Sequence, residues 1–292
     1  MKLVKPSFDI WQQPAGLEGI YKQIERAGRV CYKSEDKITE NSAKPFVGRM
    51  IESGHGAMLE HGTVYLAMPL ETMLPIEING WGKYTKNPYS KGFKVCEVNG
   101  QKRVAVTTNL RVLVENDWLD DLKYFCEPTE YHERRVTVHF VCDRGVSHEF
   151  VRHRTMSFAQ ESTRYCNYSK NKFGNELTFI VPCWAGERQE NASLEDRDIC
   201  GNTYADLCFK ENLAKAERAY FTLIKQGWTP QQARAVLPNS LKTELVVTGF
   251  TSDWEHFFGL RARGTTGAPH PQAKELAEPL MKEFITRKYI NN

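Results

Sequence analysis

Hydrophobic and polar positions follow two periods along the chain, one typical of helices and the other of strands. At residues 15–29 the apolar side chains Leu17, Ile20, Tyr21 and Ile24 fall on one stripe with helical spacing, which predicts an amphipathic helix. Further helices are predicted at about 42–54, 110–114, 119–125, 143–151, 196–226, 229–237, 252–261 and 272–289.

Three of these helices begin with a recognisable N-terminal signal. Asp143 is a residue type that caps helices, because its side chain accepts from a free backbone N–H of the first turn. Thr229 and Ser252 are each followed three residues later by a residue that completes a capping box, Gln232 and Glu255. We therefore expect Asp143, Thr229 and Ser252 to start helices.

Strands follow the second period. At 136–141 every second residue, Val136, Val138 and Phe140, is apolar, which predicts a half-buried strand. Segments with a similar pattern lie at 64–68, 95–98, 103–106, 177–181 and 245–250. Asn99-Gly100 joins the second and third of these segments as a hairpin. The sequence predicts an α/β (α+β) fold with a mixed sheet flanked by helices. We expect a single domain over 1–292, with a β-hairpin elaboration inserted at about 80–106.

Composition narrows the class of protein. A chain of 292 residues with 41% hydrophobic and 26% charged residues is ordinary for a globular protein with a substantial core. A net charge of +3 is too small to indicate nucleic-acid binding by itself. The N-terminus lacks the apolar core of a secretory signal, so a cytoplasmic protein is expected. The eight cysteines include no C-x-x-C pair, so we expect reduced thiols and no metal site.

One polar stretch, residues 149–172, concentrates the candidate chemistry. It holds five Lys or Arg residues against two Glu, a local net charge of +3, and interleaves them with hydroxyls and amides. Guanidinium groups match phosphate oxygens, so this mixture suits an anionic ligand with hydrogen-bonding edges, such as a nucleotide. A solvated surface patch would show the same composition.

Other interpretations of single residues remain open at this point. Ser162 and His153 could serve as nucleophile and base of a hydrolase, although no G-x-S-x-G elbow surrounds Ser162. His153 and His256 are each more often structural than catalytic. Arg261 ends an amphipathic helix, where it is either a surface residue or a charge held over a site. The loop that follows, returning through His270, resembles a lid.

Arg152-His153-Arg154, seven intervening residues and then Ser162 resemble the signature of the flavin-dependent thymidylate synthases. Three further segments resemble that family and occur in the same order as in the family. Together with the signature, they touch most of the chain outside about residues 70–130. These segments are His55 with Glu60-His61, Arg234-Ala235-Val236-Leu237-Pro238, and Trp254-x-His256-Phe257-x-x-Leu260-Arg261.

The resemblance implies an FAD-dependent methyltransferase that converts dUMP to dTMP. The carbon donor would be 5,10-methylenetetrahydrofolate, and NADPH would reduce the bound FAD. The family is homotetrameric with active sites shared between subunits, and it uses no covalent enzyme nucleophile. The alternative is a basic nucleotide-binding or nucleic-acid-binding protein without catalysis.

The resemblance also implies roles for individual residues, with Arg261 as the catalytic contact to the uracil ring. Expected contacts to dUMP are Glu149, Arg152, Gln160, Glu161, Ser162, Thr163, Arg164, Arg234 and Arg261. Expected contacts to FAD are His55, Arg152, His153, Arg154, Gln160, His256 and His270. Phe250 and Ser252 depart from the family pattern and receive no role.

Overall fold

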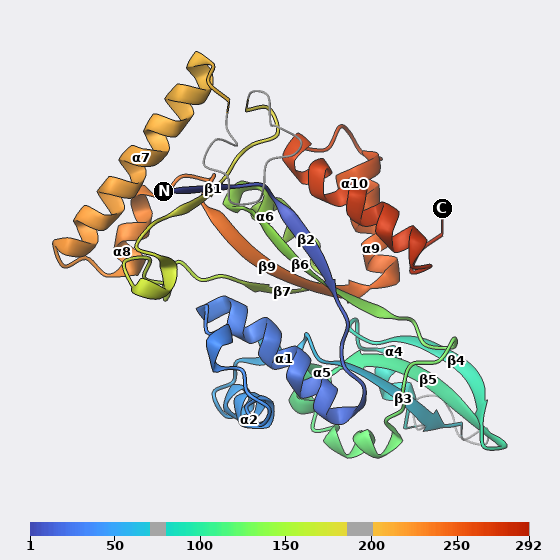
Figure 1. Cartoon of the computed structure of the whole chain (residues 1–292). Coiled ribbons are helices and arrows are strands. Elements are labelled where there is room, and N and C mark those ends of the chain that lie inside the picture. Colours follow the sequence, from blue (N-terminus) through green and yellow to red (C-terminus); the bar gives the residue numbers. More distant parts are fainter. Residues whose placement is uncertain (71–79, 186–200, 292) are drawn as a thin grey trace.

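The computed structural model describes residues 1–70, 80–185 and 201–291. Three small sheets form its framework, and helices cover them (Figure 1). The N-terminus lies beside α7, and the C-terminus lies beside α10 on the other side of the central sheet (Figure 1). The α/β class predicted from the sequence is confirmed.

The central sheet has four antiparallel strands in the order β2-β6-β9-β7. The strands are β2 (Ser7–Trp11), β6 (Arg135–Asp143), β9 (Lys242–Phe250) and β7 (Ser157–Gln160). Strands β6 and β9 pair along their full length, from Arg135 opposite Phe250 to Asp143 opposite Lys242. The predicted strands at 136–141 and 245–250 therefore form the middle of the sheet.

An aromatic core packs on one face of this sheet. Helices α6 (Arg144–Phe150), α9 (Thr251–Phe258) and α10 (Pro271–Thr286) carry it. Trp254 is fully buried, and its indole Nε1 donates to the backbone oxygen of Val136 at 3.0 Å. Each buried aromatic side chain contributes apolar area of the kind that dominates folding energy. Its partners in the core include Phe140, Phe150, Phe257, Phe258 and Phe284.

The second sheet is antiparallel, in the order β3-β5-β4. Its strands are β3 (Thr63–Pro69), β4 (Lys91–Val98) and β5 (Gln101–Asn109). The Asn99-Gly100 hairpin is confirmed, with both residues at positive φ (52° and 74°). Strand β5 pairs with β3 from Asn109 opposite Thr63 onward, so the hairpin completes a sheet. That residues 80–106 are an insertion stays a prediction.

Four helical segments pack against this second sheet and continue its hydrophobic core. They are α1 (Gly16–Tyr32), α2 (Ala43–Glu52), α5 (Leu110–Glu115) and the 3-10 helix η2 (Leu119–Tyr124). All four were predicted from the spacing of apolar residues. In Figure 1, α1 also lies along the side of the central sheet on which β7 runs, and Ala27 and Val30 of α1 are buried there with Ala159 and Val246.

The third sheet pairs β1 (Lys2–Val4) with β8 (Thr178–Ile180) in parallel. Helices α7 (Tyr204–Lys225) and α8 (Pro230–Ala233) lie beside it, and buried side chains of α7 join its core. Short elements complete the chain: η1 (Glu35–Lys37), α3 (Gly56–Leu59), α4 (Gly82–Thr85), η3 (Asn171–Phe173), η4 (Arg234–Val236) and the π-helical turn η5 (Gly259–Arg263).

Three predictions need correction. The expected single mixed sheet is wrong, because parallel pairing is confined to β1 and β8, in a sheet of their own. The Ser252 capping box is wrong: Asp253 accepts from the backbone N–H of Phe250 at 3.2 Å, and the Ser252 hydroxyl donates to Glu133 at 2.5 Å. Helix α7 begins at Tyr204, after a capping box of Thr203 and Asp206. The predicted helical start at 196–200 lies outside the described residues.

Within the described parts of the chain, no helix has the length and apolar character needed to span a membrane. The same residues contain no group of three or more His, Cys, Asp or Glu side chains arranged to hold a metal ion.

Candidate functional site

The N-terminus of α6 is fixed by Asp143, as the sequence predicted. Its Oδ1 accepts from the backbone N–H of Val146 at 2.7 Å, and its Oδ2 accepts from Gln272 Nε2 of α10 at 2.7 Å. Burial raises the pKa of the Asp143 carboxyl above its usual value. One oxygen of Asp143 thus caps α6 and the other ties it to α10. This fixes the position of α6, and with it the position of Glu149 and of the Arg-His-Arg segment at the C-terminus of α6.

Arg261 lies on η5, where a π-helical turn widens the helix, a geometry often found at functional sites. Its Nη1 donates to Glu149 Oε2 at 2.6 Å and its Nη2 to the Glu149 backbone oxygen at 2.8 Å. Its Nε donates to His153 Nε2 at 3.4 Å. The structure thus brings Arg261 together with two predicted site residues, His153 and Glu149, that lie 108 and 112 positions from it in the sequence.

His153 is buried, with 7% of its surface exposed, and packs 4.9 Å from the ring of Phe257 and 5.8 Å from that of His256. Burial lowers its pKa to about 4, and the charge of Arg261 acts in the same direction. At neutral pH His153 is therefore an uncharged acceptor for Arg261. The flanking side chains of Arg152 and Arg154 are exposed and form no ion pair with another described residue.

Gln160 and Glu161 make contacts inside the chain. Gln160 Nε2 donates to Ser147 Oγ at 2.9 Å and to Thr243 Oγ1 at 3.2 Å. Glu161 is 3% exposed and accepts from Lys242 Nζ at 2.9 Å. Buried charges of this kind require partners, and Glu161 also accepts from the Tyr168 hydroxyl at 3.0 Å. The expected contacts of both residues with dUMP or FAD stay predictions.

Ser162, Thr163 and Arg164 form a turn that begins next to α1. The Ser162 backbone N–H donates to the Cys31 backbone oxygen at 2.9 Å, and the Ser162 hydroxyl accepts from the Arg164 backbone N–H at 3.3 Å. Arg234 Nη1 donates to Thr163 Oγ1 at 3.4 Å, so the arginine of a later segment joins this turn. Among the described residues no histidine bonds to the Ser162 hydroxyl, which gives no support to the hydrolase interpretation.

Two hollows meet at Asn239, and both are lined by predicted site residues. The first, of about 290 Å³, includes Thr163 and Arg234. The second, of about 320 Å³, includes Glu149 and His270, whose ring lies 5.7 Å from that of Trp184. Sequence reasoning missed the lining residues Arg144, Trp184 and Asn239. Only Arg144 carried a signal, because it follows the cap residue of α6 directly.

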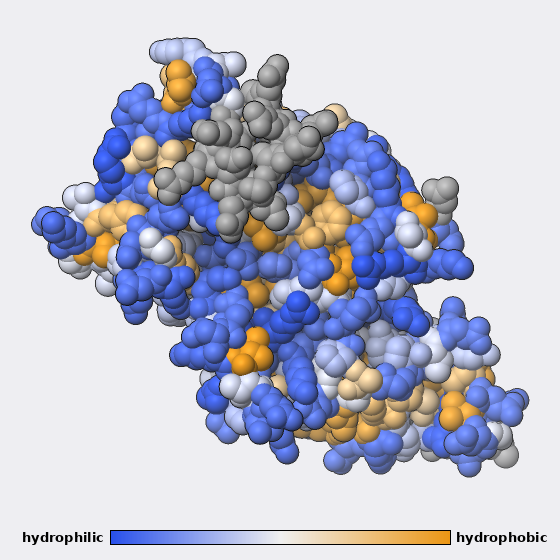
Figure 2. Space-filling model, in the orientation of Figure 1, coloured by the Kyte–Doolittle hydropathy of each residue, from blue (hydrophilic) through white to orange (hydrophobic). Residues whose placement is uncertain are grey.

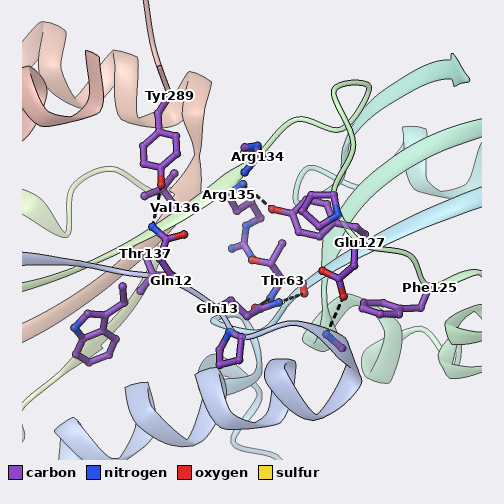
Figure 3. A pocket seen from close by; sticks show the side chains of 15 residues that line it. Gln12, Gln13, Thr63, Phe125, Glu127, Arg134, Arg135, Val136, Thr137 and Tyr289 are labelled. Carbon is purple, nitrogen blue, oxygen red and sulfur yellow. Dashed lines mark hydrogen bonds between the residues drawn. The ribbon is translucent and has the colours of Figure 1, made fainter. Parts of the chain in front are cut away.

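A third hollow lies between the central sheet and β3 and contains none of the predicted site residues (Figure 3). Its polar groups largely pair with one another. Gln13 Nε2 donates to the Thr63 backbone oxygen at 2.9 Å, and Gln12 Nε2 donates to the Tyr289 hydroxyl at 2.9 Å (Figure 3). These bonds join the segment that follows β2 to β3 and to the C-terminal segment, so this hollow is a structural junction.

His55 is the predicted site residue that stands apart. It precedes α3, its side chain is exposed, and it forms no side-chain contact with Arg261, Glu149 or His153. A contribution of His55 to the active site of another subunit stays a prediction.

The fold and these contacts define an α/β protein with two neighbouring hollows, of which the one lined by Arg144 and Arg234 suits an anionic ligand. Residues 128–287 match the family described as thymidylate synthase complementing protein, and the chain belongs to that family. The matched residues include α6, the Arg-His-Arg segment, Arg234 and Arg261. The family resemblance stated from the sequence is therefore confirmed.

Individual relatives agree with this assignment. A flavin-dependent thymidylate synthase of Corynebacterium aurimucosum is 25% identical over 276 residues, which are 93% of this chain and 78% of that protein. One of Pyrococcus abyssi is 30% identical over 149 residues, 51% of this chain and 53% of its own length. A solved UMP/dUMP methylase of Streptomyces cacaoi bound with 5-Br dUMP aligns over 98% of this chain and 93% of its own, with 17% identity and a TM-score of 0.44. That structural similarity is too weak to support a conclusion.

Proposed function

We propose that this protein is a flavin-dependent thymidylate synthase that converts dUMP to dTMP. In this reaction 5,10-methylenetetrahydrofolate supplies the carbon, and NADPH supplies the reducing electrons through FAD. The observation that carries the proposal is the contact of Arg261 with Glu149 and His153, within the residues matched by the family. A cytoplasmic location is part of the proposal.

We assign the contact with the uracil ring to Arg261. Its side chain is 18% exposed, so a ligand can reach the guanidinium although Glu149 holds it in place. A fixed positive charge beside the ring stabilises negative charge on N3, O2 and O4 and polarises the pyrimidine for reaction at C5. Because Glu149 accepts from Arg261 at both its side chain and its backbone, the charge needs little reorganisation when the ligand enters.

We assign the phosphate of dUMP to the turn at residues 162–164, which Arg234 contacts through Thr163. Ser162 and Thr163 offer hydroxyls, and Arg164 and Arg234 offer guanidinium groups, which bind phosphate oxygens in bidentate fashion. Arg164 is exposed, and neither it nor Arg234 forms an ion pair with a described carboxylate. Arg152, Gln160 and Glu161 complete the proposed nucleotide contacts.

The residues present fit an anionic flavin cofactor. Arg152 and Arg154 are exposed cations that have no acidic partner in the part of the chain that the structure describes, which suits the pyrophosphate of FAD. The uncharged His153 and the exposed His256, His270 and His55 offer rings and N–H groups toward the flavin. FAD, when bound and reduced, supplies the hydride that completes the methyl group.

The proposed chemistry uses no covalent nucleophile of the enzyme. Burial raises the pKa of Cys31 to about 11 and that of Cys166 to about 12, so both thiols are protonated at neutral pH. A thiol in this state is a poor nucleophile. The Ser162 hydroxyl has no base among its described partners.

Assembly into a homotetramer with shared active sites belongs to the proposal. Large apolar side chains are exposed next to the site, among them Trp184 at 60% and Tyr165 at 60%. In Figure 2, apolar surface also gathers over the part of the molecule built from the β3-β5-β4 sheet. Surfaces of this kind often mark contacts between proteins. The isolated position of His55 would be explained if it acted on a neighbouring subunit.

Two measurements test the proposal. Purified protein incubated with FAD and then desalted is expected to keep the visible absorption of a flavin. Turnover in deuterated water, followed by mass spectrometry of the nucleotide product, is expected to give dTMP only when dUMP, methylenetetrahydrofolate and NADPH are all present. Protein that stays colourless with FAD, or that binds dUMP without forming dTMP, would favour a binding protein without catalysis.

A further inference from the structure

Arg144 begins α6 at a point where three segments meet. Its backbone N–H donates to the backbone oxygens of Asn239 at 2.9 Å and of Leu241 at 3.2 Å, which ties the start of α6 to the segment before β9. The side chain plays no part in these bonds. Its position is therefore fixed by the backbone, and its guanidinium group remains available for another purpose.

The guanidinium of Arg144 has no acidic partner among the described residues. Its Nη1 atom is buried and makes no hydrogen bond. Two shielded cations near the site are paired with carboxylates: Lys242 with Glu161 at 2.9 Å and Arg261 with Glu149 at 2.6 Å. A buried donor without an acceptor costs about 1–3 kcal/mol. A ligand oxygen that reached Nη1 would remove this cost.

Arg144 lines the same hollow as Arg234 and Thr163. The lining residues of that hollow include two arginines and no Asp or Glu. Two guanidinium groups without a carboxylate between them create a local positive potential, which attracts a group carrying two negative charges. A phosphate monoester is the group of this charge that a nucleotide provides.

Asn239 lines both this hollow and a second one, whose lining includes Glu149, the partner of Arg261. A mononucleotide with its phosphate beside Arg144 and Arg234 would therefore have its base on the side of Glu149 and Arg261. This arrangement matches one nucleotide lying across both hollows.

We infer that Arg144 is a substrate-binding residue that grips the nucleotide phosphate together with Arg234 and Thr163. The inference rests on the proposed function for the identity of the nucleotide, dUMP. It assigns to Arg144 a role in affinity and phosphate recognition and none in the chemistry at C5. Arg144 thus makes the enzyme select a nucleotide over a nucleoside.

The test compares Arg144→Gln with the unchanged protein by calorimetric titration with three probes: dUMP, deoxyuridine and inorganic phosphate. We expect Arg144→Gln to weaken dUMP and phosphate binding at least tenfold and to leave the weaker deoxyuridine binding unchanged. In turnover assays, KM for dUMP rises while kcat stays within about twofold. Arg144→Lys, which keeps the charge and loses the bidentate fork, should recover part of the affinity.

The matched control is Arg218→Gln, an exposed arginine of α7 that does not line either hollow, and it should leave all three affinities unchanged. The inference is overturned if Arg144→Gln binds dUMP as tightly as the unchanged protein. Equal losses for dUMP and deoxyuridine would overturn it too, because they indicate a structural role for the side chain.

These outcomes separate the inference from the proposed function. If the unchanged protein forms dTMP and Arg144→Gln keeps the same KM for dUMP, only the inference fails. If dUMP binding depends on Arg144 but no dTMP forms with all substrates present, the proposed function fails and the phosphate contact stands. A thermal melt of each variant checks that the backbone anchor of Arg144 is intact.

Discussion

Arg261 and Glu149 are joined twice, since the guanidinium donates to the carboxylate at 2.6 Å and to the backbone oxygen of the same residue at 2.8 Å. The second bond goes to a carbonyl in the last turn of α6, which also accepts from the backbone N–H of Arg152 at 3.3 Å. Arg261 therefore closes α6 and presents a fixed charge at the same time. This double role makes the pair the centre of the proposed site.

Replacing Arg261 with alanine should separate chemistry from cofactor binding. We expect turnover to fall at least 100-fold, corresponding to a loss of roughly 3 kcal/mol of transition-state stabilisation, because the charge beside the pyrimidine is gone. FAD retention, measured by flavin absorption after desalting, should change little. Arg263→Ala is the control, since Arg263 is exposed on the same turn and has no described partner. Unchanged turnover in Arg261→Ala would exclude the catalytic role.

Ser162→Ala tests whether the hydroxyl binds or reacts. The variant loses one hydrogen bond to a charged group, so KM for dUMP should rise about tenfold while dTMP formation stays measurable. Ser169→Ala, in the same polar stretch but bonded to Asn167, should leave KM unchanged. If dTMP formation ceased entirely while dUMP still bound, the nucleophile interpretation would return.

Local patterns were sufficient for much of the fold. The alternation at 136–141 predicted the middle of β6, and Asp143 was predicted as the cap of α6, because both depend on neighbours a few residues away. The pairing of β5 with β3 and the separation into three sheets depend on contacts between distant segments, which spacing does not encode. The error at Ser252 has the same origin: its hydroxyl bonds to Glu133, 119 residues away.

The residues of the candidate site could also be predicted only in part. The Arg-His-Arg segment, Arg234 and Arg261 could be named from the sequence because motifs carry them. Which of them meet could not be predicted, since Arg261 and Glu149 are 112 positions apart. Arg144 belongs to no motif: the sequence marks it only as the residue after the cap of α6, and its unpaired Nη1 becomes visible in the folded chain.

The carboxylate of Asp143 should contribute measurable stability. In Asp143→Ala the backbone N–H of Val146 and the amide of Gln272 lose their acceptor, which we expect to cost about 1–3 kcal/mol in the free energy of unfolding. Asp143→Asn keeps one side-chain oxygen as a cap and should lose less. Urea unfolding measures both variants, and equal stability of Asp143→Ala and the unchanged protein would contradict the capping role.

His61 makes stability depend on pH. The imidazole is fully buried, its Nδ1 bonds to Thr248 Oγ1 at 2.8 Å, and its Nε2 forms no hydrogen bond with any described residue. Burial, together with the positive charge of Arg135, lowers its pKa to about 3. The unfolded chain binds a proton at this histidine near pH 6.5, whereas the folded chain does not until about pH 3. Stability from His61 is therefore complete above pH 6.5 and is lost as the pH falls.

Between pH 6.5 and pH 5 this difference should remove about 2 kcal/mol from the free energy of unfolding, at about 1.4 kcal/mol per pH unit. Urea unfolding at pH 7, 6 and 5 measures it. His61→Asn, which can keep the bond to Thr248 without a titrating group, should be less stable at pH 7 because it fills less space, yet its stability should decline less steeply with falling pH. The pKa of His153 is also lowered, so part of the dependence of stability on pH remains in His61→Asn. If His61→Asn and the unchanged protein lost stability in parallel from pH 7 to pH 5, His61 would not be the buried neutral histidine that the structure shows.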